Sequence, residues 1–210
     1  MHDIIRVRLV SKKSSTPDMT SLVLASTSRF RRELLARLGL PFAAVAPVCD
    51  ETPLPGEHAA ATARRLASVK ARSLAHAYPD ALIIGSDQVA VLDGRIIGKP
   101  HTHEKAHQQL TRASGASVSF LTGLTLLNSQ TGHYQTDCVP FTVHMRELDA
   151  ERIERYLRIE QPYDCAGSFK SEGLGIALFE SIDSKDPTAL VGLPLIALSQ
   201  MLRRAGFTLP

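Results

Sequence analysis

Apolar residues fall into two kinds of pattern along this chain. Short continuous apolar runs are typical of buried strands, and apolar positions that recur every three or four residues are typical of helices. The first clear run, Ser21–Ala25, leads into a helical pattern that starts after STS at 26–28 and ends at Gly39. Small hydroxyl residues are preferred helix N-caps and glycine is a preferred C-cap. The segment is therefore predicted to be a strand–loop–helix unit.

The rest of the chain continues in the same way. Strands are expected at 42–48, 82–92, 118–128, 135–145 and 175–181, helices at 59–77, 102–113, 149–159 and 193–205, and a glycine-spaced loop at 166–175. Helices are interleaved with both single strands and hairpins. A mixed-sheet α/β fold is therefore favoured over a purely parallel βαβ stack.

The stretch LIIGSDQVAVLDGRIIGKP at 82–100 predicts a β-hairpin. Asp93-Gly94 between apolar runs is typical of a tight turn whose two central residues have positive φ. Counting outward from the turn gives three facing pairs, Leu92 with Arg95, Ala90 with Ile97 and Gln88 with Lys99. Asp87 and Lys99 are therefore expected to be near neighbours at the open end, either as a structural ion pair or as part of a site.

The first 18 residues lack a strong periodic pattern and include KKSSTP at 12–17. We interpret Met19 as the natural start or residues 1–18 as a flexible N-terminal extension. Residues 19–210 are predicted to form a single domain. A short strand over residues 4–10 is the alternative.

Composition narrows the class of protein. The chain has 210 residues, of which 44% are hydrophobic and 21% charged, and this is ordinary for a globular protein with one sizeable core. A net charge of +3 gives no support for a nucleic-acid partner, although it is compatible with a local basic pocket for a small polyanion.

Three cysteines without C-x-x-C spacing favour neither a disulfide framework nor a cysteine zinc site, and they fit reduced thiols in a cytosol. No apolar run approaches the roughly 18 residues of a membrane span, and no signal-peptide pattern opens the chain. We therefore predict a cytoplasmic protein without a membrane partner.

The segment STSRFRR at 26–32 combines small hydroxyl residues, a helix start and three arginines. Free N–H groups at a helix N-terminus and arginine side chains are both good phosphate donors. Positive charge here opposes the helix dipole, and such a local conflict often marks function. The loop hydroxyls, the free N–H groups and the three arginines, Arg29, Arg31 and Arg32, are candidate phosphate ligands, the alternative being a capped helix with solvated arginines.

Lys70 lies in an apolar row with Leu66 and Leu74, at helical spacing. It either extends past its apolar neighbours to solvent or lines a pocket. Glu51 follows the end of a predicted strand, where acids are common in turns. Together with Asp87, however, it would supply two oxygen ligands of the kind that hold Mg²⁺ against phosphates.

Two further groups of side chains have weaker signals. Glu172 lies in the glycine-spaced loop, as part of a functional loop or of an ordinary surface loop. His103 and His107 are four residues apart on a predicted helix, but without a third ligand they indicate a solvated face. Metal-assisted hydrolysis of a nucleotide polyphosphate needs groups of the kinds found here, which are two carboxylates, two lysines and a helix start with arginines.

Seven motifs occur in one order along the chain: LASTSRFRRELL, DETP at 50–53, RLASVKA, IIGSDQV, GKP, AGSFKSEG and LVGLPL. In this the sequence resembles the Maf family of nucleoside triphosphate pyrophosphatases, from Ser21 to nearly the end. The resemblance implies a two-lobed, mixed-sheet Maf/ITPase-like fold with a central cleft. It also implies a divalent cation (Mg²⁺, Mn²⁺ or Co²⁺) and hydrolysis of a nucleoside triphosphate to the monophosphate and pyrophosphate.

The resemblance assigns roles to individual residues. Asp87 is expected to activate water and, with Glu51, to hold the metal. The phosphates are expected to contact a basic and hydroxyl set formed by Arg31, Lys70, Lys99, Ser26 and Ser28. Members of the family often form homodimers, which is therefore also an expectation.

Three positions separate branches of this family. The branch acting on 7-methyl-GTP has an aromatic residue, Gln and Glu, which match Phe30, Gln88 and Glu172. The dTTP/UTP branch has Arg, Thr and Gln instead. The cationic 7-methylguanine base suits an aromatic face and a carboxylate. Phe30 departs from the usual Trp of the 7-methyl-GTP branch and is a weaker cation–π partner. The alternatives are another noncanonical nucleotide, dTTP/UTP, or a non-catalytic binding protein linked to cell division.

Overall fold

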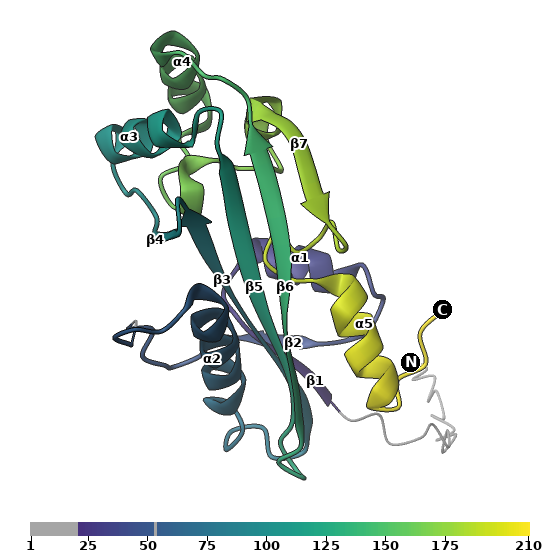
Figure 1. The fold of residues 1–210 in the computed structure, drawn as a ribbon. Helices are drawn as coiled ribbons and strands as arrows, with labels where there is room; N and C mark the ends of the chain where they lie inside the picture. The colour runs from purple at the N-terminus through teal and green to yellow at the C-terminus, as the bar shows by residue number, and fades with distance from the viewer. Residues whose placement is uncertain (1–20, 53) are drawn as a thin grey trace, which may run out of the picture.

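The computed structural model describes residues 21–52 and 54–210, and within them the chain forms one seven-stranded mixed sheet covered by helices (Figure 1). In chain order the elements are β1 (Ser21–Ala25), α1 (Arg29–Ala36), β2 (Ala43–Val45), α2 (Ala59–Arg72), β3 (Ala81–Leu92), β4 (Arg95–Ile97), α3 (His103–Ala113), β5 (Ser117–Asn128), β6 (Tyr134–Met145), α4 (Ala150–Glu160), the 3₁₀ turns η1 (Ala166–Ser168) and η2 (Leu174–Leu178), β7 (Phe179–Ser184) and α5 (Leu195–Arg204).

The sheet combines parallel and antiparallel pairing. Its order is β2-β1-β3-β5-β6-β7, and β4 pairs with the same edge of β3 as β1 does, farther along the strand. β1 is parallel to both β2 and β3, and all other pairs are antiparallel. The predicted mixed-sheet α/β fold is confirmed.

Three long strands, β3, β5 and β6, run through two lobes (Figure 1). In one lobe, the side chains of β1, β3 and β5 alternate between a core with α1 and α5 on one face and a core with α2 on the other. In the second lobe the far halves of the long strands pack against α3 and α4. The burial of strands on both faces explains their continuous apolar runs.

Helix α2 lies unusually close to the sheet. A Cβ built on Gly85 of β3 would be 2.0 Å from the Ala67 carbonyl oxygen, and one built on Gly123 of β5 would be 2.0 Å from that of Ala63. Glycine in the strands and alanine in the helix therefore bring the two backbones into contact. This contact decides where the side chains of α2 lie relative to β3.

The expected elements are present, with shifted boundaries. The predicted strand at 42–48 is limited to Ala43–Val45, and the predicted helix at 59–77 ends at Arg72. The predicted strand at 175–181 was wrong in its start, because η2 precedes β7.

The turn of the predicted hairpin is confirmed, with φ of 51° at Asp93 and 72° at Gly94. The ladder ends at Ala90 and Ile97, so the predicted pairing of Gln88 with Lys99 was wrong. Gln109 of α3 donates to the Gly98 carbonyl at 3.1 Å, and Pro100 has no N–H to continue the ladder.

The predictions about residues 1–18, including a strand at 4–10, lie outside the described residues. None of the helices in the described part of the chain combines the length and the apolar character needed to cross a membrane.

Candidate active site

A cavity of about 680 Å³ lies between the two lobes, and every side chain predicted from the sequence lines it. These are Ser26, Ser28, Phe30, Arg31, Glu51, Lys70, Asp87, Gln88, Lys99 and Glu172. They come from separate segments of the chain, from β1 to the loop before β7. The structure thus brings the predicted set together, while their chemical roles remain predictions.

The cavity opens at a gap in the edge of β3. β1 pairs with β3 only as far as Gly85, and β4 pairs with it only from Ala90. Among the described residues no strand covers this edge between them. Successive residues of a strand point to opposite faces of a sheet. Because the edge is open, Asp87 on one face and Gln88 on the other can both line a single cavity.

The loop between β1 and α1 is shaped by its own hydroxyl groups. Ser26 is 6% exposed, and its Oγ accepts from the Ser28 N–H at 3.1 Å. Ser28 is the N-cap of α1, as predicted, and its Oγ accepts from the Arg31 N–H at 3.4 Å. Residues 28–31 line the cavity, so the first turn of α1, with its positive helix end, faces it.

Arg31 is fixed across the cavity by the loop that precedes α5. Its Nε donates to the Gly192 carbonyl at 2.8 Å, and within the described residues its two terminal nitrogens make no hydrogen bond. Burial lowers the pKa of Arg31, and the charges of Asp87 and Glu51 partly offset this. A basic residue is charged below its pKa, and arginine stays charged in proteins. Arg31 therefore offers a cation to an anionic ligand.

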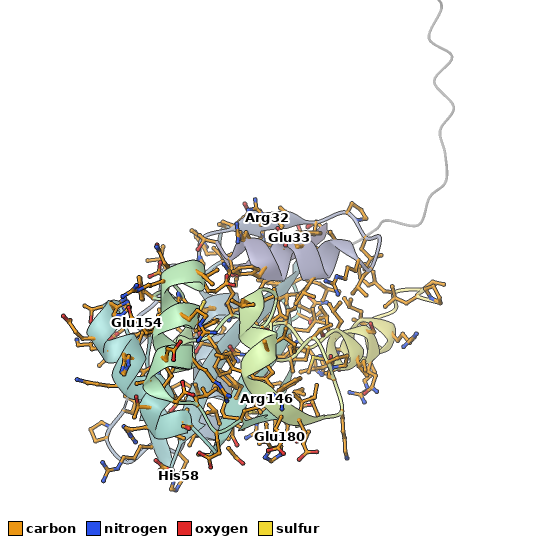
Figure 2. All side chains as sticks on the ribbon, turned by 90° about the horizontal axis from the view of Figure 1, so that it is seen from above. Arg32, Glu33, His58, Arg146, Glu154 and Glu180 are labelled. Carbon is orange, nitrogen blue, oxygen red and sulfur yellow. The ribbon has the colours of Figure 1, made fainter. Side chains whose placement is uncertain are left out.

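The other two arginines of the loop differ in position from Arg31. The Arg29 guanidinium lies over the Phe30 ring, with its carbon 4.6 Å from the ring centroid. Arg32 is exposed, and Figure 2 shows it with Glu33 on the outer side of α1. Only Arg31 is anchored toward the interior.

Lys70 joins two carboxylates at the floor of the cavity. Its Nζ lies 2.5 Å from Asp87 Oδ1 and 2.8 Å from Glu51 Oε1, and its side chain is only 8% exposed. Of the two alternatives for Lys70, the structure has it lining the cavity and not extending to solvent. The ion pair of Asp87 is thus with Lys70, because α2 lies against the glycines of the sheet. The expected Asp87–Lys99 pair is not made, and Lys99 is exposed.

The loop that carries Glu172 is held by a half-buried ion pair. Glu160 at the end of α4 accepts from Lys170 Nζ at 2.8 Å and from the Leu174 N–H at 2.7 Å. The Lys170 ammonium and the Leu174 N–H hold the pKa of Glu160 below its ordinary value. Glu172 itself is exposed at the cavity, and its carboxylate accepts from Ser171 Oγ at 2.9 Å.

Residues 189–192, for which the sequence predicted no role, close the other side of the cavity. We call this segment the strap. Its Gly192 carbonyl accepts from Arg31 and also from Ser86 Oγ at 2.8 Å. Its first two carbonyls face Gln88. Buried Asp186 fixes the strap, since its carboxylate accepts from the N–H of Thr188 at 3.1 Å and of Ile196 at 2.7 Å. The LVGLPL motif was the only signal of this segment in the sequence.

The donor set suits a divalent cation held together with a nucleotide. Asp87 and Glu51 converge closely enough for both to contact one ammonium group. Mg²⁺ prefers oxygen ligands and is commonly held by one or two carboxylates plus substrate phosphates and waters. No group of three or more His, Cys, Asp or Glu side chains in metal-binding range occurs over 21–52 and 54–210.

The three cysteines are unpaired, as predicted. Burial raises the pKa of the thiols of Cys49, Cys138 and Cys165. The thiols therefore stay protonated at neutral pH, and a neutral thiol is a poor nucleophile and metal ligand. Although Cys165 lines the cavity, the chemistry of the site lies with its carboxylates and cations.

A family model described as "Maf-like protein" matches residues 21–205. The chain belongs to the Maf family. Similar proteins include the Pseudomonas fluorescens (strain Pf-5) protein named 7-methyl-GTP pyrophosphatase, which is 66% identical over 192 residues, 91% of this chain and 100% of the relative.

Two more Maf relatives have the same name. The Pseudomonas aeruginosa PAO1 protein is 59% identical over 192 residues, 91% of this chain and 100% of the relative. The Thiobacillus denitrificans protein is 60% identical over 186 residues, 89% of this chain and 92% of the relative. The family resemblance drawn from the seven motifs is confirmed.

Proposed function

We propose that this Maf protein is a nucleoside triphosphate pyrophosphatase whose substrate is 7-methyl-GTP. The observation that carries the proposal is the Lys70 ammonium between Asp87 and Glu51, on the floor of a cavity rimmed by Arg31 and Lys99. This places a carboxylate base for water activation beside cations for phosphates. The names of the relatives support the same function.

The cavity provides one anchor for each part of the triphosphate chain. The start of α1 and the terminal nitrogens of Arg31 donate to phosphate oxygens, and Ser26 and Ser28 shape the loop around them. Lys70 and Lys99 add positive charge on the opposite side. Asp87, whose Oδ1 contacts the Lys70 ammonium, accepts a proton from the attacking water. The water oxygen forms a bond to phosphorus of the α–β anhydride as that anhydride bond breaks, and the monophosphate and pyrophosphate leave.

A divalent cation completes this proposal. Glu51 and Asp87 would hold it, because their carboxylates converge and are hard oxygen ligands. When bound, the cation supplies charge neutralisation for the phosphates. Arg31 and Lys99 would contact further phosphate oxygens.

The base is recognised apart from the phosphates, by Phe30, Gln88 and Glu172. Phe30 lines the cavity, and the face of an aromatic ring attracts a cation. A cationic 7-methylguanine would be favoured by the same attraction. Glu172 supplies a carboxylate at the same cavity.

The direct test is pyrophosphate release from 7-methyl-GTP, GTP, ITP, dTTP and UTP, each with Mg²⁺, Mn²⁺ or Co²⁺. We expect the highest kcat/KM for 7-methyl-GTP. A preference for dTTP or UTP would instead support the other branch, and inactivity with every nucleotide and metal would support a binding protein.

Asp87→Asn tests the assignment of the base. It keeps the side-chain shape but loses the proton acceptor, and we expect kcat to fall by about 10²–10⁴-fold with an unchanged circular dichroism spectrum. A variant that retained more than half of the wild-type kcat would show that Asp87 is not the base.

A further inference from the structure

Three oxygen atoms surround the nitrogen end of the Gln88 side chain. Gln88 Nε2 lies 3.0 Å from Thr122 Oγ1, 2.9 Å from the Ala189 carbonyl and 3.0 Å from the Leu190 carbonyl. Carbonyl oxygens only accept hydrogen bonds, and the amide NH₂ group only donates them. The NH₂ group therefore has to face the strap, and the amide oxygen has to face the opposite way.

Thr122 removes the remaining freedom of this amide. Its side chain is fully buried, and its hydroxyl donates to the Ala189 carbonyl at 2.9 Å. A hydroxyl has a single hydrogen, so toward Gln88 this oxygen can only accept. A reversed amide would place Gln88 Oε1 against three oxygens with no hydrogen to share, which is unfavourable in a low-dielectric site.

The amide oxygen of Gln88 is left for the cavity. Across the described part of the chain, Oε1 takes part in no hydrogen bond, and no buried side-chain nitrogen or oxygen lacks a partner. Oε1 is therefore accessible, and Gln88 lines the cavity. The ionised carboxylate of Glu172 also only accepts. Both polar side chains assigned to the base therefore present acceptors.

We propose that Gln88 reads the base through its amide oxygen alone, and that Thr122 is a positioning residue that holds this orientation together with the strap carbonyls. The inference rests on the proposed pyrophosphatase function. The site then selects bases that present N–H donors along the edge that pairs with another base. Guanine presents two adjacent donors, N1–H and the 2-amino group. Adenine has an acceptor at N1, which an amide oxygen repels. With adenine bound, the Gln88 amide oxygen would therefore stay unpaired.

The test compares Thr122→Val with Thr122→Ser, using GTP and ATP and measuring pyrophosphate release. Valine keeps the shape of threonine but removes the hydroxyl, so the Gln88 amide loses one of its three fixed partners. We expect the preference for GTP over ATP in kcat/KM to fall about 5- to 10-fold, as for the loss of about one hydrogen bond. The change should come from a higher KM for GTP, with kcat retained. Serine keeps the hydroxyl and should retain the wild-type preference.

A second readout does not depend on activity. In ¹H–¹⁵N spectra of the wild type without nucleotide, the side-chain amide protons of Gln88 should exchange more slowly than those of exposed glutamines, and Thr122→Val should speed their exchange. If Thr122→Val does not fold, Gln88→Met takes its place, since it removes the acceptor and should abolish the preference.

The inference is overturned if Gln88 exchanges as fast as exposed glutamines, if Thr122→Val leaves the preference unchanged, or if it lowers kcat equally for both nucleotides. Wild-type protein that releases pyrophosphate from no nucleotide would sink the proposed function instead. In that case the exchange measurement still decides the orientation of the amide.

Discussion

The glycine contacts under α2 give a sharp way to perturb the site without touching any residue that lines it. In Gly123→Ala, the new Cβ would lie 2.0 Å from the Ala63 carbonyl oxygen and 2.9 Å from the Arg64 nitrogen. These are backbone atoms of α2, so no side-chain rotation relieves the clash. The helix has to move away from the sheet by about 1 Å to restore van der Waals separation.

The movement affects both stability and activity. Overpacking of this kind typically destabilises a protein by about 1–3 kcal/mol. At about 2–4 °C per kcal/mol for a chain of this size, the melting temperature should fall by roughly 2–12 °C. The same movement draws Lys70 away from Asp87, which it now contacts at 2.5 Å. Because a 1 Å misplacement at a catalytic site can reduce the rate by about 10²-fold, we expect kcat to fall by about 10- to 100-fold.

The assay is calorimetry together with pyrophosphate release from 7-methyl-GTP. Gly98→Ala is the matched control for stability, because no atom lies within 4 Å of its new Cβ and its backbone is not left-handed. Its melting temperature should match that of the wild type. A Gly123→Ala protein that kept both the wild-type melting temperature and kcat would refute the view that helix contact positions Lys70.

Three other changes test separate parts of the site. Glu172→Gln should lower kcat/KM for 7-methyl-GTP by about 10- to 100-fold, through loss of a charge-assisted contact, and leave GTP much less affected; equal losses would make Glu172 structural. Phe30→Trp should raise kcat/KM for 7-methyl-GTP, because Trp is the stronger cation–π partner; no change would remove the ring from the base contact. Glu160→Gln should lower the melting temperature at pH 7. The pKa of Glu160 is lowered on folding, so its stabilisation is present above its ordinary pKa of 4.5 and is lost as pH falls below that value. The difference between variant and wild type should therefore shrink in melting curves taken from pH 7 toward pH 4, and a constant difference would contradict it.

The residues that line the cavity could be predicted from the sequence, but their contacts could not. Periodicity and caps are local, so the start of α1 at Ser28 and the Asp93-Gly94 turn could be derived from neighbouring residues. The pair of Asp87 with Lys70 could not, because it depends on how closely α2 approaches the sheet. That distance is determined by glycines on two different strands, which no short sequence window contains.

The strap illustrates a second reason for such gaps. Its contribution is made by backbone carbonyls, at residues 189, 190 and 192, rather than by side chains. Every residue type has a backbone carbonyl, so composition and spacing could not predict the role of the strap. Buried Thr122 is likewise an ordinary strand residue by pattern, and only its hydrogen bonds to Gln88 and Ala189 distinguish it.

Asp87 and Gln88, at the open edge of β3, lie on opposite faces of the sheet, and the strap connects the residues on one face with Arg31. Asp87 points to the face covered by α2, where Lys70 and Glu51 lie, whereas Gln88 and Ser86 point to the face covered by the strap. On the proposed assignment, chemistry and base recognition thus use opposite faces of one strand. The strap, however, accepts from Gln88 at one end and from Arg31 at the other. Changes to Gln88 or Thr122 should therefore couple with changes to Arg31 in double-mutant cycles. Lys70 makes no hydrogen bond to the strap, so changes to Lys70 should be additive with changes to Gln88 or Thr122. Additivity between Thr122 and Arg31 would mean that the strap is too flexible to carry this coupling.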